Sequence, residues 1–162
     1  MLIRPATEAD WPGIWPFFRE IVEAGETYAL PTGLEADEAR PLWFAPGFEV
    51  VVAVDDEGAG ILGSAKFGPN RDGRGSHVAT ASFMVSSSAA GRGVGRALGE
   101  HVLVAARDAG YRSMQFNAVV ATNTRAVALW HSLGFETLAT VPEAFEHPSL
   151  GFVGLEVMYR KL

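Results

Sequence analysis

Hydrophobic and polar positions follow two different periods along the chain, and each period predicts one kind of element. Apolar residues three and four positions apart indicate amphipathic helices, and runs of β-branched residues indicate strands. The helices predicted in this way are residues 7–24, 34–44, 92–109 and 122–133. The strands predicted in this way are residues 2–4, 49–55, 61–67, 77–86, 112–119, 135–140 and 152–159.

Prolines, glycines and polar residues mark the connections between these elements. Pro16 predicts a kink or a break in the first helix, because proline removes one hydrogen bond of a helix interior. Residues 56–60 predict a turn that joins two strands in a hairpin. The last two strands are predicted to be separated by a loop that contains Pro142, His147 and Pro148.

The order of the predicted elements is strand, two helices, three strands, helix, strand, helix and two strands. This order indicates a mixed α/β (α+β) fold, with a mostly antiparallel central sheet of about seven strands and about four helices. The length of 162 residues is sufficient to bury a hydrophobic core. No internal repeat or change of composition divides the chain, so residues 1–162 are predicted to form a single domain.

Composition and charge restrict the possible functions. Hydrophobic residues make up 48% of the chain and charged residues 20%, as in ordinary globular proteins. The formal net charge of −6 argues against a nucleic-acid partner. The absence of cysteine excludes disulfides, cysteine-based zinc sites and a thiol nucleophile. It also fits a cytoplasmic protein, and we expect no metal ion. No apolar run reaches the roughly 18 residues of a membrane span, so we expect no membrane partner.

The segment of residues 83–98 carries the clearest chemical signal in the sequence. A strand-like run ends there in small polar residues, and the sequence G-x-G-x-G then opens a predicted helix. Gly91, Gly93 and Gly95 allow the main chain to approach an anion closely, and the N-terminus of a helix supplies unpaired N–H groups. The spacing fits neither a Walker-type loop nor a dinucleotide fingerprint. A tight turn that starts a helix would use the same glycines, so the motif alone leaves both interpretations open.

Two segments together resemble the GCN5-related N-acetyltransferase (GNAT) superfamily. Residues 90–95 are similar to its acetyl-CoA loop, (Q or R)-x-x-G-x-(G or A), and residues 123–135 to its segment N-x-x-A-x-x-L-(Y or W)-x-x-x-G-F. The resemblance implies the GNAT-like acyl-CoA N-acyltransferase fold over nearly the whole chain, with acetyl-CoA as co-substrate. Ala90 departs from the pattern, so we expect main-chain amides to bind the pyrophosphate. Arg92 and Arg96, four residues apart on one predicted helical face, are expected to support them.

The resemblance also implies where acetyl-CoA binds. The main-chain N–H of Val85 is expected to polarise the thioester carbonyl as the oxyanion donor. Many family members have a tyrosine that protonates the leaving thiolate where this chain has Trp130, and an indole cannot supply a proton near neutral pH. Asn123 can instead cap a helix, and Trp130 can belong to the core. The cofactor-binding residues implied are Phe83, Met84, Val85, Arg92, Gly93, Val94, Gly95, Arg96, Asn123, Ala126 and Trp130.

Residues 116–123 further resemble acetyltransferases that act on proline analogues such as azetidine-2-carboxylate. In that subgroup, an asparagine at the position of Asn117 binds the substrate. Asn117 stands in an apolar run, so we expect a buried amide with partners from the substrate or the neighbouring backbone. Thr80, at a position where that subgroup often has asparagine, and Tyr28 are the other expected substrate-binding residues.

Acetyl transfer to an amine requires that the amine loses its proton. The candidate bases are His77, Glu26, Glu143 and His147. His77 is favoured among them, because it follows a glycine-rich loop and starts the strand that leads to the glycine motif.

The sequence therefore predicts an acetyl-CoA-dependent N-acetyltransferase for the amine of a small molecule, such as an amino acid or an analogue. Direct attack in a ternary complex is expected, because an acetyl-cysteine intermediate is impossible. The alternatives are a protein, peptide or herbicide-type N-acetyltransferase, and a non-catalytic acyl-CoA sensor. The resemblance also implies a homodimer.

Overall fold

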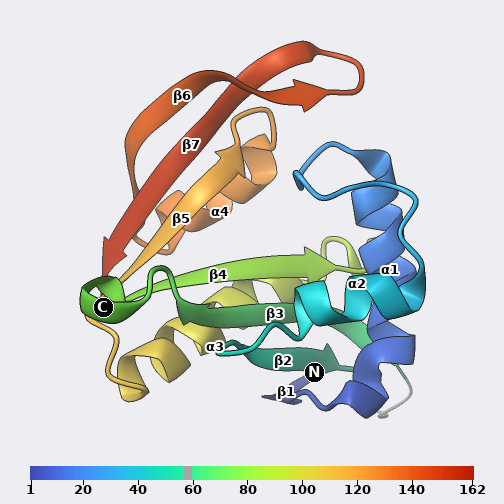
Figure 1. The fold of residues 1–162 in the computed structure, drawn as a ribbon. Helices are drawn as coiled ribbons and strands as arrows, with labels where there is room; N and C mark the ends of the chain where they lie inside the picture. The colour runs from blue at the N-terminus through green and yellow to red at the C-terminus, as the bar shows by residue number, and fades with distance from the viewer. Residues whose placement is uncertain (57–59) are drawn as a thin grey trace.

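A computed structural model describes residues 1–56 and 60–162, and its centre is a seven-stranded sheet (Figure 1). The predicted turn at residues 56–60 falls mainly on positions 57–59, outside the described residues. The strands are β1 (Leu2–Pro5), β2 (Glu49–Val54), β3 (Ile61–Pro69), β4 (Val78–Val85), β5 (Ser113–Val120), β6 (Glu136–His147) and β7 (Gly151–Lys161). The α-helices in the described ranges are α1 (Trp11–Ala24), α2 (Ala36–Trp43), α3 (Val94–Asp108) and α4 (Thr124–Ser132).

The sheet has the order β1-β2-β3-β4-β5-β7-β6, and only β4 and β5 pair in parallel. Their pairing is short, because it joins only Val78 to Ser113 and Ala79 to Met114. Beyond Ala79 the two strands diverge, and Figure 1 shows β5 rising away from β4. The mixed, mostly antiparallel fold predicted from the element order is therefore confirmed, and it contains a gap between two central strands.

Helices cover the two faces of the sheet and bury separate groups of side chains. On one face, α3 packs against β3 and β4 through fully buried residues such as Leu98 and Val102. On the other face, α1 and α2 bury Phe18 and Trp43 against β2 and the end of β4. Each large apolar side chain buried in this way contributes about 1.5–3 kcal/mol to folding. The gap between β4 and β5 lies beside these two cores.

A buried polar contact fixes α2 on the sheet. The indole Nε1 of Trp43 donates to the hydroxyl of Ser64 at 2.9 Å, and this hydroxyl donates to the carbonyl of Val51 at 2.9 Å. Ser64 is completely buried, so both of its bonds replace contacts with water. The contact joins α2, β3 and β2 into one unit.

The predicted break at Pro16 is wrong, because α1 continues through this residue from Trp11 to Ala24. Ile14, Phe17 and Phe18 are buried next to the proline. The burial of this apolar face offsets the loss of one backbone hydrogen bond in the helix.

The predicted loop between the last two strands is mostly strand. β6 continues to His147 and β7 begins at Gly151, so the connection is shorter than predicted. Pro142 is tolerated because β6 is an edge strand, which needs hydrogen bonds on one side only. The register shifts between Val141 and Phe145, and Glu143 has a positive φ of 51° there. Pro142, which predicted a loop, lies at this irregularity within strand β6.

Candidate active site

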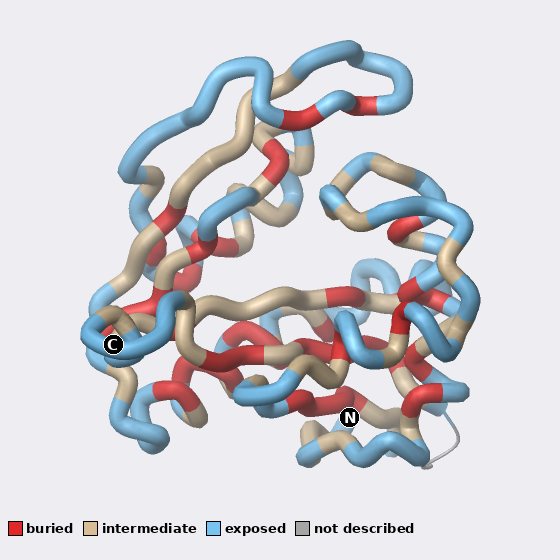
Figure 2. Tube along the Cα trace, viewed as in Figure 1, coloured by how far each residue is buried: buried red, intermediate tan, exposed pale blue. Residues whose placement is uncertain are grey.

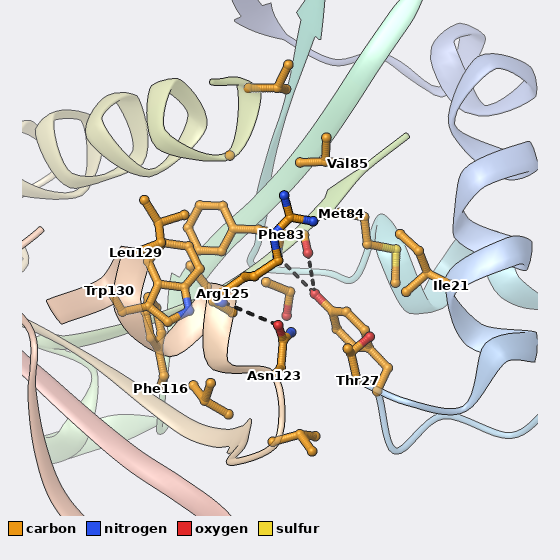
Figure 3. A pocket seen from close by; sticks show the side chains of 18 of the residues that line it. Ile21, Thr27, Phe83, Met84, Val85, Phe116, Asn123, Arg125, Leu129 and Trp130 are labelled. Carbon is orange, nitrogen blue, oxygen red and sulfur yellow. Dashed lines mark hydrogen bonds between the residues drawn. The ribbon is translucent and has the colours of Figure 1, made fainter. Parts of the chain in front are cut away.

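A cavity of about 960 Å³ occupies the gap between β4 and β5. Its volume is at the upper end of the usual range for small-molecule sites. Much of its lining comes from β4, β5, the glycine loop, α4 and the segment between α1 and α2, which are far apart in the sequence (Figure 3). Lys66 of β3 and Arg96 of α3 line it as well. The divergence of two strands therefore creates the space, and several separate segments supply its chemistry.

The free edge of β4 presents main-chain groups to this cavity. The N–H of Phe83 donates to the hydroxyl oxygen of Tyr28 at 3.0 Å, and the carbonyl of Phe83 accepts from that hydroxyl at 2.7 Å. The polar groups of Phe83 therefore point away from β3, its antiparallel neighbour. Because this orientation repeats every second residue, the N–H of Val85 also faces the gap.

The glycine loop exposes the N-terminus of α3 to the same cavity. Gly91 and Gly93 each have a φ of +77°, a conformation that favours glycine. No side chain among residues 1–56 and 60–162 caps α3, and the N–H groups of its first turn have no partner within the helix. Gly93, Val94 and Gly95 all line the cavity. This cradle of main-chain N–H groups suits a phosphate.

The two predicted basic residues have different surroundings. Arg92 precedes α3, does not line the cavity, and lies 3.5 Å from a carboxylate oxygen of Asp55. Arg96 lines the cavity and donates to the hydroxyl of Ser132 at 2.8 Å. The prediction that the two arginines lie on one face of a helix is wrong. Gly91 and Gly93 have positive φ values, and α3 begins only at Val94, after Arg92.

Helix α4 packs beside α3 and forms another part of the cavity wall. Asn123 caps this helix by accepting from the N–H of Ala126 at 3.3 Å, and both residues line the cavity. The ring of Trp130 lies 4.7 Å from that of Phe83 and 4.9 Å from that of Phe116. Trp130 is 7% exposed, so it joins α4, β4 and β5 as part of the core and also forms the cavity wall (Figure 3).

Asn117 lines the cavity, but the expectation of a buried amide is wrong because the residue is exposed. Its partners are side chains and not backbone groups. The Nδ2 of Asn117 donates to the Oδ1 of Asn70 at 2.5 Å, and Gln115 Nε2 donates to Asn117 Oδ1 at 2.9 Å. Thr80 lines the same cavity. The sequence did not indicate Asn70 or Gln115 as partners of Asn117. Gln115 stands two residues before Asn117, a spacing that puts both on the same face of a strand.

The charged residues around the cavity are all basic. Lys66, Arg96 and Arg125 line it, and no aspartate, glutamate or histidine among residues 1–56 and 60–162 does so. The side chain of Arg125 extends from α4 into the cavity (Figure 3). In a chain with a net charge of −6, this is a local positive site that the total charge concealed.

Lys66 is held in the cavity wall by aromatic rings and one carbonyl. Its ammonium donates to the carbonyl of Leu42 at 2.6 Å and lies 5.6 Å from the ring of Trp43 and 5.2 Å from that of Phe48. Burial lowers the pKa of this lysine. The strand register places Lys66 opposite Ser82 and one diagonal step from Thr80. A fixed cation therefore stands beside an expected substrate-binding residue.

The predicted bases do not line the main cavity. His77 is exposed, and Glu143 lies at the irregularity in the edge strand β6. Glu26 and His147 line a smaller cavity of about 190 Å³. The two cavities have three lining residues in common, which are Thr27, Asn123 and Arg125.

Comparison with known proteins identifies the family to which this chain belongs. The acetyltransferase (GNAT) family model matches residues 15–135, and the chain belongs to this family. The N-acetyltransferase aca1 of Schizosaccharomyces pombe is 30% identical over 142 residues, which are 79% of this chain and 68% of that protein.

Two solved structures extend the comparison over almost the whole chain. A GCN5-related N-acetyltransferase from Kribbella flavida is 57% identical, with a TM-score of 0.95 over 99% of this chain and 97% of that chain. A phosphinothricin acetyltransferase from Sinorhizobium meliloti, solved in complex with acetyl-CoA, is 25% identical, with a TM-score of 0.87 over 99% of this chain and 88% of that chain. The protein is thus an N-acetyltransferase that uses acetyl-CoA as co-substrate. No helix in the described ranges is long and apolar enough to cross a membrane.

Proposed function

We propose that the enzyme acetylates a small amine that also carries a carboxylate, namely an amino acid or an amino-acid analogue. The observation that carries this proposal is the charge of the cavity, whose described lining contains Lys66, Arg96 and Arg125 and no acidic residue. Such a lining attracts an anionic group and repels a polyamine. The side chains of Asn117 and Thr80 add uncharged hydrogen-bonding groups for the same acceptor.

The donor half of the proposal rests on main-chain groups. Bound acetyl-CoA supplies an activated acetyl thioester. The N–H groups of Gly93, Val94 and Gly95 would hold its pyrophosphate, with Arg96 beside them. The N–H of Val85 would donate to the oxygen that becomes negative during the reaction. Asn123, Ala126 and Trp130 would line the pantetheine arm.

Direct attack of the amine on the thioester requires no side-chain base in the cavity. A bond forms between the acceptor nitrogen and the acetyl carbon, the carbon–sulfur bond breaks, and the amine proton passes to water. Lys66 and Arg125 favour this course, because nearby positive charge lowers the pKa of a bound ammonium group. Because the indole of Trp130 cannot supply a proton, the departing thiolate takes its proton from solvent. His77 has no part in this proposal, since it does not line the cavity.

The acceptor subgroup is proposed from local similarity. Residues 116–123 resemble the acetyltransferases of proline analogues, which makes azetidine-2-carboxylate the first acceptor to test. The relative from Sinorhizobium meliloti is named as a phosphinothricin acetyltransferase, so phosphinothricin is the second. Both molecules combine an amine with an acidic group.

Binding and turnover measurements separate this proposal from its alternatives. Isothermal titration should give heat with acetyl-CoA and with desulfo-CoA, and its absence would contradict the donor site. Thiol release should then follow the addition of amino acids or their analogues. Turnover of peptides or polyamines alone would contradict the acceptor class, and binding without turnover of any amine would identify a sensor.

The role of Lys66 has a direct test with a matched pair of acceptors. Replacing Lys66 by methionine should raise the KM for azetidine-2-carboxylate about 10-fold, because a charge-assisted bond to the carboxylate is lost. The KM for azetidine, which has no carboxylate, should not change. Lys161→Met is the matched control, because Lys161 is exposed at the end of β7. An equal effect on both amines would contradict the carboxylate contact.

We also propose that the enzyme forms a homodimer through the β6–β7 hairpin. Leu138, Val141, Leu150 and Phe152 are exposed there by 46–66%, and Figure 2 shows most of the hairpin exposed. An apolar edge of this kind commonly binds another protein surface. Light scattering should give the mass of two chains for the wild type and of one chain for Phe152→Asp. A monomeric wild type would contradict the proposal.

A further inference from the structure

Tyr28 makes an unusual pair of hydrogen bonds across the active site. It belongs to the segment between α1 and α2, and it reaches a strand residue 55 positions later in the chain. Its hydroxyl donates to the carbonyl of Phe83 at 2.7 Å and accepts from the N–H of the same residue at 3.0 Å. One side chain thus satisfies both main-chain polar groups of Phe83.

The place of these bonds explains why β4 needs them. Pairing between β4 and β5 ends at Ala79, so the edge of β4 beyond that point has no neighbouring strand. A strand edge without partners bends or fills its hydrogen bonds with water. The Tyr28 hydroxyl supplies one donor and one acceptor at Phe83, as a neighbouring strand would. The edge stays fixed while the gap for acetyl-CoA stays open.

The hydroxyl remains protonated in this position. Burial raises the pKa of Tyr28 well above its ordinary value, although the bonds from Phe83 and Ser82 act in the opposite direction. A phenol with a raised pKa is a poor proton donor to a thiolate, since the transfer would run against the two pKa values. Tyr28 is therefore suited to hold a neutral hydrogen bond and not to act as the missing general acid.

We propose that Tyr28 is a positioning residue that acts through β4. By fixing Phe83, it holds the N–H of Val85, two residues further on, in the direction of the thioester. Because Thr27, Tyr28 and Ala29 also line the cavity, the same contact connects the segment between α1 and α2 to the unpaired edge of β4. This inference rests on the proposed role of the Val85 N–H and is independent of the acceptor class.

The test removes the hydroxyl and keeps the ring, in the variant Tyr28→Phe. Hydrogen exchange of the Phe83 amide, followed by NMR, should become at least about 10-fold faster. The kcat for azetidine-2-carboxylate should fall about 10-fold, while the Kd for CoA, which has no thioester carbonyl, stays within about 2-fold of the wild type. The control is Tyr111→Phe, because Tyr111 lies outside the cavity lining. It should change none of these three quantities.

A binding measurement keeps this test independent of the acceptor. If Val85 is held toward the thioester, the wild type should bind acetyl-CoA and CoA with different affinities, and Tyr28→Phe should reduce that difference. This result would hold even if no tested amine were acetylated, a failure that would count against the proposed function alone. Faster exchange at Phe83 with unchanged kcat and affinities would overturn the positioning role. Unchanged exchange with a raised acceptor KM would assign Tyr28 to substrate contact instead.

Discussion

The two walls of the cavity present different kinds of chemical group. The proposed donor wall, formed by residues 83–85, Gly91 and residues 93–96, presents main-chain N–H groups at a strand edge and a helix N-terminus. The proposed acceptor wall is formed by Lys66, Thr80 and Asn117, with Asn70 bonded to Asn117, and it presents side chains from β3, β4 and β5. Main-chain binding requires glycines at fixed spacing, which leaves a motif in the sequence. Side-chain binding depends on which strands become neighbours, and this leaves no motif.

Among the variants that should affect only one of the two walls, Gly93→Val is expected to have the largest effect. Gly93 has a φ of +77°, and an added Cβ would meet no protein atom within 4 Å. The new side chain would therefore stand in the space where the main chain receives an anion, at a backbone position strained for valine. The Kd for acetyl-CoA should rise about 100-fold, as measured by isothermal titration.

Gly47 provides a matched control for this change. It has a φ of +81° and equally open surroundings, and it does not line the cavity. Gly47→Val should carry a similar cost in thermal stability, about 1–3 kcal/mol, without weakening acetyl-CoA binding. If both variants lost affinity equally, backbone strain alone would account for the effect and the anion cradle would be wrong.

On the acceptor wall, Asn117→Ala should raise the KM for azetidine-2-carboxylate about 10-fold, because a hydrogen bond to the acceptor is lost. The Kd for acetyl-CoA should stay unchanged. Asn70 and Asn117 bond to each other, so the effects of Asn70→Ala and Asn117→Ala should not be additive in the double variant. Steady-state kinetics of the four proteins give this result, and additive effects or weaker acetyl-CoA binding would show that the walls are not separate.

The same contrast explains what the sequence could predict. Gly93, Val94, Asn123 and Trp130, which the sequence predicts to bind the cofactor, all line the cavity, and the pattern that singles them out is local to one loop or one helix. The order and number of strands also followed from local patterns. In each case the signal and the structure lie within about twenty residues of each other.

The features that the sequence did not reveal depend on distant partners. Asn117 is 47 residues from Asn70, and no local pattern connects the two amides. The β6 strand extends beyond Val141 because β7 pairs with it there, although Pro142 signals a loop. Tyr28 was expected to bind substrate, but its bonds to Phe83 join segments that only the fold brings together.

A smaller effect should distinguish the two arginines near the glycine loop. Arg96 lines the cavity, whereas Arg92 is paired with Asp55 outside it. Arg96→Ala should raise the Kd for acetyl-CoA about 3-fold to 5-fold, and Arg92→Ala by less than about 2-fold, since exposed ion pairs contribute little. The effect of Arg96→Ala should shrink at high salt, because ions screen the pyrophosphate. A larger effect from Arg92→Ala would move the anion site toward the loop before α3.

The smallest effect is expected from His77→Ala, although His77 was the favoured base in the sequence. The residue is exposed and does not line the cavity. If the cationic lining allows the acceptor to bind as a neutral amine, kcat/KM should rise from about pH 6 to about pH 9 with the ionisation of the amine itself. The wild type and the variant should give the same profile, within about 2-fold at each pH. A loss of the rising part in His77→Ala alone would restore the histidine as the base, and the acceptor wall would then have to extend along β4 to its first residues.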